Sequence, residues 1–137
     1  VKVTDLGKKE AIQAIEAAYW AFPMWGSLLA SDRAQQVGRL AELIRGNAED
    51  LSILLTLEQG KPAQESLGEV LDAANALQWA AEEACRIHGV TQCDPDGERS
   101  GMTIRQPMGV VGVITPWNFP FSIPAQKSFA AIAAGCT

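Results

Sequence analysis

The strongest constraint on the fold is one apolar run near the end of the 137-residue chain, at residues 109–114. The run is rich in β-branched side chains and does not alternate with polar ones, which is typical of a strand buried on both faces of a parallel sheet. A loop bounded by prolines follows at residues 115–120, and residues 122–134 have the composition of a helix that ends at Gly135. Strand, loop and helix form half of a βαβ crossover, so we expect the start of a larger α/β domain whose next strand begins directly after Thr137.

Helical periodicity predicts two helices in the first third of the chain. The first is expected to end near Pro23, because proline removes a backbone donor and clashes with the preceding turn. Ser31 is the expected N-cap of the second helix, since its hydroxyl can accept a hydrogen bond from a free N–H of the first turn. Gly46 is the expected end of that helix. The expected inward faces are Ile12, Ile15, Tyr19 and Phe22 in the first helix, and Val37, Leu40 and Ile44 in the second.

Two further helices are predicted between Asn47 and Gly89. The third helix begins at Asn47 and ends at Gly60, because glycine with a proline two residues beyond is a common stop signal. The fourth runs from Pro62 to His88, with Gly89 as its C-cap. Its apolar arc is too broad for a single partner, so we expect this helix to pack on more than one side. Its expected inward positions are Leu67, Val70, Leu71, Ala74, Leu77, Gln78, Ala81, Ala84 and Cys85.

Residues 90–108 have the pattern of a β-hairpin. Asp94, Pro95, Asp96 and Gly97 form a turn signal, and the alternation from Met102 to Arg105 is that of a half-exposed strand. The sequence therefore predicts an α/β chain in three parts: a mainly helical lead-in over residues 1–89, the hairpin, and a strand–loop–helix unit over residues 109–137. The last part is expected to be the first unit of a Rossmann-like parallel sheet and to be incomplete at its C-terminus.

Composition and charge exclude several classes of function. The net charge of −5 gives no electrostatic support for binding nucleic acid or an anionic membrane surface. No apolar run reaches the roughly 18 residues of a membrane span. The three cysteines form no CxxC pair and His88 is the only histidine, so we expect no metal site and a reducing, cytoplasmic compartment.

The loop at residues 115–120 carries the most informative chemistry. It follows the carboxyl end of the expected strand, which is where open α/β sheets bind ligands. Asn118 can aim its NH₂ donor at a developing oxyanion, and Trp117 can provide an apolar wall. An alternative is a proline-rich turn whose asparagine only satisfies local backbone groups, because asparagine is common in turns. The residues alone leave both interpretations open.

Three segments of the chain resemble one enzyme superfamily. The run QPMGVVGVITPWNFP at residues 106–120 resembles the signature of the aldehyde dehydrogenases, and AAIAAGCT at residues 130–137 continues it in register. LTLEQGKP at residues 55–62 and WAAEEA at residues 79–84 are similar to segments of the succinate-semialdehyde dehydrogenase-like branch. The resemblance covers essentially the whole chain and implies an N-terminal fragment of such an enzyme.

The resemblance implies oxidation of an aldehyde to a carboxylic acid with NAD or NADP, by a parent protein that is a homo-oligomer. Asn118 would then hydrogen-bond the oxygen of the thiohemiacetal formed from the aldehyde. In this family the nucleophilic cysteine and the general-base glutamate lie far downstream of the position of Thr137. None of the three cysteines here inherits that role, so the chain by itself is expected to be inactive. The residues implied to lie along the nicotinamide cofactor are Ile114, Thr115, Pro116, Trp117 and Asn118.

One departure from the family pattern concerns the substrate. Succinate-semialdehyde dehydrogenases carry an Arg-Lys pair shortly after the Pro-Trp-Asn-Phe-Pro motif, and this chain has Gln126 followed by Lys127. A neutral amide cannot form the bidentate, charge-assisted pair that an arginine makes with a carboxylate. A semialdehyde substrate and a broader range of aldehydes therefore both stay open. A naturally short, non-catalytic relative that acts as a binding or assembly module is the alternative to an enzyme.

Overall fold

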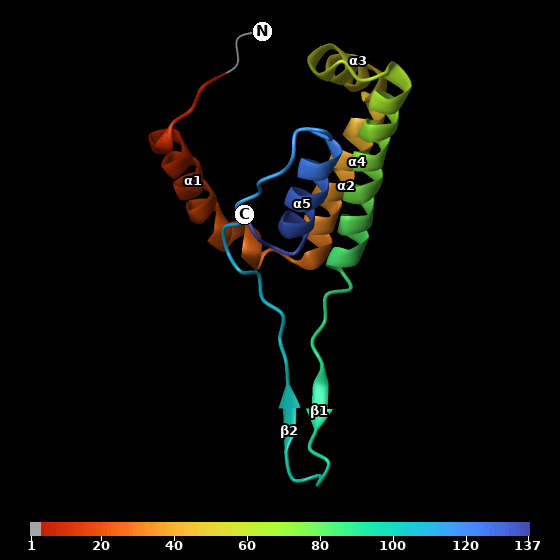
Figure 1. Cartoon of the computed structure of the whole chain (residues 1–137). Coiled ribbons are helices and arrows are strands. Elements are labelled where there is room, and N and C mark those ends of the chain that lie inside the picture. The colour runs from red at the N-terminus through yellow and green to blue at the C-terminus, as the bar shows by residue number, and fades with distance from the viewer. Residues whose placement is uncertain (1–3) are drawn as a thin grey trace.

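A computed structural model describes residues 4–137 and is mostly helical (Figure 1). Helices α2, α4 and α5 lie side by side, α3 lies at one end of this bundle, and the hairpin β1–β2 projects from the other end (Figure 1). Helix α1 packs near the C-terminal end of the chain, apart from α4. The helices are α1 (Lys8–Ser27), α2 (Ala30–Gly46), α3 (Ala48–Gln59), α4 (Ala63–Ala84) and α5 (Ser122–Ala133), and the strands are β1 (Thr91–Cys93) and β2 (Ser100–Met102).

Helix α4 forms the centre of the core. It contacts α2, α3 and α5, so the prediction that it packs on more than one side is confirmed. Val70 and Leu77 are fully buried, whereas Leu71 is 38% exposed and Cys85 is exposed, so the expected inward positions of these last two are wrong. The buried face repeats every three or four residues, as an α-helix requires. It is made of Ser66, Glu69, Val70, Ala73, Ala74, Leu77, Ala80, Ala81 and Ala84.

The first helix differs from the prediction at its end and on its face. It continues through Pro23 to Ser27, because the turn beyond the proline is anchored: the indole Nε1 of Trp25 donates to the carbonyl of Ile132 at 2.9 Å. That tertiary contact stabilises a turn that lacks one backbone donor. The expected inward face is also wrong, since Ile15 and Tyr19 are 57% and 61% exposed and α1 buries no residue fully.

The predicted helix ends and starts are each confirmed in part: Asn47 is the N-cap of α3 as expected, whereas Gly89 does not cap α4. The ends of α2 at Gly46 and of α3 before Gly60 are confirmed, and Gly60 has the left-handed φ of 75° that glycine adopts freely. Ser31 is not an N-cap, because Leu29 occupies that position and makes no side-chain capping bond. Helix α4 stops at Ala84, before the expected His88, where the backbone N–H of Arg86 bonds the carbonyl of Glu83 and tightens the last turn.

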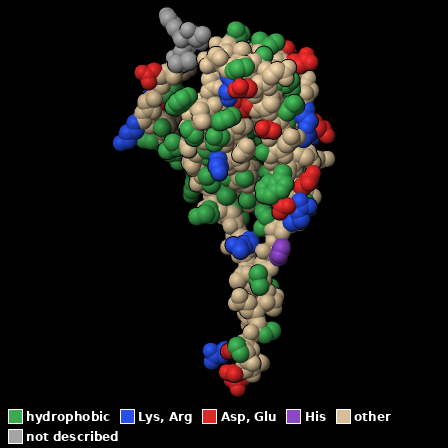
Figure 2. Space-filling model, turned by 45° about the vertical axis from the view of Figure 1, so that its right-hand side comes forward, with side chains coloured by type: hydrophobic (Ala, Val, Ile, Leu, Met, Phe, Trp, Pro, Cys, Tyr) green, Lys and Arg blue, Asp and Glu red, His purple; other side chains and the backbone are tan. Residues whose placement is uncertain are grey.

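The expected hairpin is present between the bundle and the C-terminal segment. β1 and β2 pair antiparallel, with Thr91 opposite Met102, and the N–H of Gly97 closes the turn on the carbonyl of Asp94 at 2.9 Å. Both strands are exposed, and β2 ends at Met102, so the expected half-exposed strand to Arg105 is wrong. Charged side chains gather at the hairpin tip (Figure 2).

The apolar run at residues 109–114 is extended but belongs to no strand within residues 4–137. Burial on both faces is not observed: Val111 is 39% exposed and Ile114 is fully exposed, because no neighbouring strand of the described chain covers them.

Two backbone hydrogen bonds connect this run to the C-terminal residue of the chain. The N–H of Val111 donates to the carbonyl of Thr137 at 2.8 Å, and the N–H of Thr137 donates to the carbonyl of Gly109 at 3.1 Å. Two such bonds flanking one residue have the pattern of a parallel ladder.

Candidate functional site

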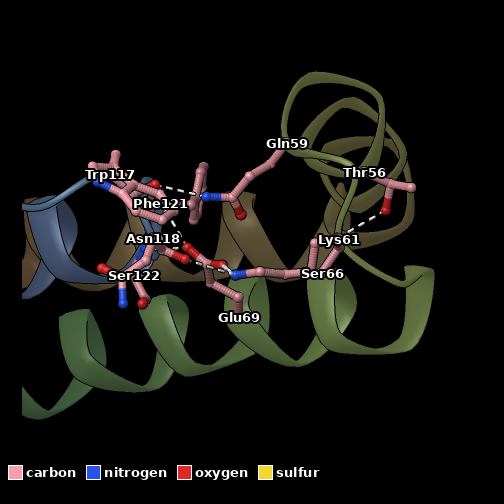
Figure 3. A network of polar contacts seen from close by, with 9 residues as sticks. All are labelled: Thr56, Gln59, Lys61, Ser66, Glu69, Trp117, Asn118, Phe121 and Ser122. Carbon is pink, nitrogen blue, oxygen red and sulfur yellow. Dashed lines mark hydrogen bonds and ion pairs between the residues drawn. The ribbon is translucent and has the colours of Figure 1, made fainter.

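The loop that precedes α5 presents apolar side chains on the surface. Ile114 is fully exposed, Trp117 is 82% exposed and Phe119 is 44% exposed. Exposed aromatic and aliphatic groups of this size are able to contact a flat heterocycle or another part of a protein. The backbone beneath them is held by side chains from the end of α3, from the connection between α3 and α4, and from α4 (Figure 3).

Glu69 is the buried centre of this network. Its side chain lies on the inward face of α4 and is 1% exposed. Its Oε1 accepts hydrogen bonds from the backbone N–H groups of Phe121 at 2.9 Å and Ser122 at 3.2 Å. These N–H groups are at the start of α5, where they have no partner within the helix. A carboxylate from another helix therefore caps α5 and complements the positive end of its dipole.

Lys61 connects the same carboxylate to the loop. Its Nζ forms an ion pair with Glu69 Oε2 and donates to the backbone carbonyl of Asn118 at 3.1 Å. The ammonium also lies 4.2 Å from the ring centroid of Phe119, within the range of a cation–π contact. With 11% of its side chain exposed, Lys61 is nearly as enclosed as its partner. The pair thus holds both ends of residues 118–122.

The electrostatics of Glu69 follow from these contacts. Burial by itself raises the pKa of the carboxyl group, because the charged form loses hydration. The hydrogen bond from Lys61 and those from the two backbone N–H groups favour the carboxylate and outweigh that effect. The pKa of Glu69 is therefore held below its ordinary value of 4.5. The group is ionised in the folded protein at neutral pH.

Gln59 forms a second link to the loop. Its Nε2 donates to the carbonyl of Trp117 at 2.6 Å, and a carbonyl can only accept, so the amide orientation is fixed. Gln59 Oε1 is buried and has no hydrogen-bond partner among residues 4–137. At the other side of the network, the hydroxyl of Thr56 donates to that of Ser66 at 2.8 Å and joins α3 to α4.

Asn118 is exposed, and its side-chain amide makes no hydrogen bond to any residue that the structure describes. Its backbone carbonyl is bonded by Lys61, so the residue is fixed through its main chain while its side chain stays available. An asparagine that only satisfied local backbone groups would use this amide for them. The geometry leaves the amide free to donate to a ligand.

The other residues of the predicted site lie beside Asn118 in the chain. Ile114, Pro116 and Trp117 are exposed and Thr115 is half-buried. Gln126 and Lys127 lie exposed on α5. Within the described residues no cluster of His, Cys, Asp or Glu is arranged to hold a metal ion, and no helix is long and apolar enough to cross a membrane.

Sequence reasoning missed Glu69 and the connecting role of Lys61. Glu58 and Glu65 are the acidic residues that the sequence places near Lys61, yet both are exposed and neither joins the network. A signal was present, since Glu69 falls on the apolar arc of α4 between Ser66 and Val70. A carboxylate at such a position requires a buried partner.

Comparison with known proteins shows one family along the entire chain. The model described as "Aldehyde dehydrogenase family" matches residues 1–137. A glutarate-semialdehyde dehydrogenase of Pseudomonas aeruginosa is 44% identical over 135 residues, which are 98% of this chain and 28% of that protein. A probable NADP⁺ succinate-semialdehyde dehydrogenase of Sinorhizobium fredii is 46% identical over 136 residues, covering 99% of this chain and 28% of that protein. The chain thus spans little more than a quarter of these relatives.

Solved structures agree with these relatives. An NADP-dependent enzyme of Escherichia coli superposes with a TM-score of 0.94 at 42% identity, over 98% of this chain and 28% of that one. An NAD-dependent aldehyde dehydrogenase of Sinorhizobium meliloti superposes with a TM-score of 0.88 at 36% identity, over 94% of this chain and 26% of that one. The helical bundle and its hairpin therefore match the corresponding part of both enzymes.

Proposed function

Since the chain belongs to the aldehyde dehydrogenase family, we propose that the protein containing it oxidises an aldehyde to a carboxylic acid with NAD⁺ or NADP⁺ as the oxidant. Similar proteins include enzymes of both cofactor types, so the choice between the two cofactors stays open. The 137-residue chain alone is proposed to be inactive, because the family's nucleophilic cysteine and general-base glutamate are not matched by any residue in it.

The role proposed for Asn118 is to donate a hydrogen bond to the oxygen of the aldehyde as negative charge develops there. The observation that carries this proposal is that Lys61 holds the backbone of Asn118 while the side-chain amide of Asn118 is free. A donor whose backbone is held in place before the reaction needs less reorganisation to stabilise the transition state. The carbonyl group of the bound aldehyde would then lie against this amide.

The loop side chains fit one face of a nicotinamide cofactor. Ile114 and Trp117 expose large apolar surfaces beside a half-buried Thr115, and no acidic side chain lies within residues 114–120. Such a surface can hold a flat ring and repels no phosphate. When bound, the cofactor supplies a hydride acceptor. The residues proposed to line it are Ile114, Thr115, Pro116, Trp117 and Asn118.

The backbone pair between Val111 and Thr137 supports the proposed parallel sheet. A chain that leaves α5 and bonds beside residues 109–111 in the same direction has the pattern of a βαβ crossover, a connection that is right-handed in nearly all proteins. We propose that residues 109–114 become an interior strand of a Rossmann-like sheet in the complete protein, which would cover Val111 and its neighbours.

A semialdehyde is the first substrate class to test, because both curated relatives described above act on one by name. Gln126 is the observation that favours a second, broader class, since its neutral amide cannot pair with a substrate carboxylate as an arginine would. Comparing kcat/KM for succinate semialdehyde and for an uncharged aldehyde of similar length separates the two classes. A Gln126→Arg variant should shift the ratio toward the semialdehyde if this position contacts the carboxylate.

Asn118→Ala in the full-length protein tests the central proposal. Loss of one oxyanion donor should lower kcat by about 10²–10³-fold, and Asn118→Asp should be at least as damaging because a carboxylate repels the developing charge. Cofactor Kd and melting temperature should change little. A folded Asn118→Ala enzyme that retains wild-type kcat would show the assignment to be wrong.

A further inference from the structure

We infer that Lys61 and Gln59 are positioning residues that set the direction of the Asn118 side chain, with Glu69 as the buried anchor of Lys61. This inference rests on the proposed function, because it concerns the orientation of the proposed oxyanion donor. It is carried by one juxtaposition: the last residue of α3 and the connection to α4 reach two successive carbonyl groups, one on each side of the Asn118 Cα atom (Figure 3).

The two peptide planes that flank Asn118 are each held by one side chain. Gln59 Nε2 bonds the carbonyl of Trp117, which belongs to the plane before the Asn118 Cα atom. Lys61 Nζ bonds the carbonyl of Asn118, which belongs to the plane after it. Because peptide units are planar, their orientations determine φ and ψ at the residue between them. Those two angles fix the direction of the Cα–Cβ bond, so the two hydrogen bonds together fix the base from which the amide extends.

Lys61 is itself immobilised, which a positioning role requires. A lysine side chain has four rotatable bonds and loses much conformational freedom when it is held in one geometry. Here the Nζ atom has three partners: the carboxylate of Glu69, the carbonyl of Asn118 and the ring of Phe119. Glu69 is fixed in turn by the two N–H groups at the start of α5. The anchor therefore ties the loop to the most deeply buried helix of the bundle.

None of these bonds ends on a polar side chain of the loop. Gln59, Lys61 and Glu69 all bond backbone atoms between Trp117 and Ser122. A network that served stability alone could equally bond the side-chain amide of Asn118, whose own backbone carbonyl it already bonds. Leaving it unbonded keeps the amide available while its base is held.

A double-mutant cycle on the full-length protein tests the inference. Lys61→Met keeps the length of the side chain and removes its donors. We expect kcat to fall by about 10–100-fold, because a shift of about 1 Å in a catalytic group can cost that much. KM and cofactor Kd should stay close to wild type. In an Asn118→Ala background the same substitution should change kcat by less than about threefold, since the group that Lys61 aims is then missing.

Two further variants complete the design. Gln59→Leu acts on the other peptide plane without touching the ion pair, and should show the same dependence on Asn118 even if Lys61→Met fails to fold. Glu65→Gln is the matched control, because Glu65 is an exposed carboxylate in the first turn of α4 and lies outside the network. It should leave kcat unchanged. Melting temperatures measured on the same preparations separate misfolding from misplacement.

The outcomes distinguish the inference from the proposed function. Equal losses of kcat in the wild-type and Asn118→Ala backgrounds would overturn the inference, because Lys61 and Gln59 would then act independently of Asn118. Wild-type kcat in Lys61→Met and Gln59→Leu, together with a strong loss in Asn118→Ala, would also overturn it and leave the proposed function standing. Wild-type kcat in Asn118→Ala would overturn the proposed function itself.

Discussion

Removing the carboxylate of Glu69 should release the start of α5, and the structure gives the size of the effect. Two backbone N–H groups, of Phe121 and Ser122, share its Oε1 atom. A hydrogen bond to a charged group contributes about 1.5–3 kcal/mol, so a shared pair is worth about 3 kcal/mol at the low end. Since 1.4 kcal/mol corresponds to a factor of ten, Glu69→Leu should reduce the hydrogen-exchange protection of these two amides by about 100-fold.

Glu69→Gln provides a second point on the same scale. The amide oxygen can still accept both bonds, but charge-assisted bonds are about twice as strong as neutral ones, so about half of the energy, near 1.5 kcal/mol, should be lost. The expected fall in protection is then about tenfold. Amide exchange in the full-length protein measures it, and amides of α2 serve as an internal reference for global destabilisation. Equal protection of the Phe121 and Ser122 amides in Glu69→Gln and wild type would refute the reasoning.

Three other predictions follow from the same contacts. The pKa of Glu69 is lowered in the folded state, so its ionised carboxylate stabilises the fold above the ordinary value of 4.5, and this contribution is lost as pH falls through the lower folded-state pKa. The melting temperatures of wild type and Glu69→Gln should therefore differ at pH 7 and converge in acid. Gly89→Ala should open the root of the hairpin to proteolysis, since its Cβ would lie 1.7 Å from the carbonyl oxygen of Thr103, whereas Gly101→Ala, with nothing within 4 Å, should not. The isolated 137-residue chain should produce no NAD(P)H from an aldehyde; thiol-sensitive production by purified chain would contradict this.

Local signals account for the parts of the fold that were predicted correctly. Gly60 ends α3 because its left-handed φ of 75° turns the backbone out of the helix, which is independent of distant contacts, and Gly46 is the last residue of α2, where the side chain of Asn47 donates to the carbonyl of Leu43. The same holds for the hairpin turn that closes at Gly97. Expectations failed where a tertiary contact decides the outcome. The hydrogen bond from Trp25 to the carbonyl of Ile132 lets α1 continue past Pro23. No sequence pattern near residue 23 predicts a partner that lies 107 residues from Trp25.

The candidate site likewise has one part that local sequence predicts and one part that depends on distant contacts. Asn118 could be found from the sequence because the prolines and the tryptophan around it are adjacent in the chain. Glu69 could not be paired from the sequence, because its partners lie 8, 52 and 53 residues away. An acidic residue within a helix is most often solvated, and only its place on the apolar arc of α4 distinguishes it.

Two segments that mark the family separately are joined in the structure as one physical unit. Gln59 and Lys61 come from the segment at residues 55–62, and they bond the backbone of Trp117 and Asn118, which are 58 and 57 residues further along. Because the bonds end on carbonyl groups, they constrain the path of the loop and not the identity of most of its side chains. The loop can therefore change its apolar surface, and with it the ligand face, without losing the support beneath Asn118. The three supporting residues are instead constrained by the bonds that they make: Gln59 and Lys61 must reach the two carbonyl groups, and Glu69 must hold Lys61.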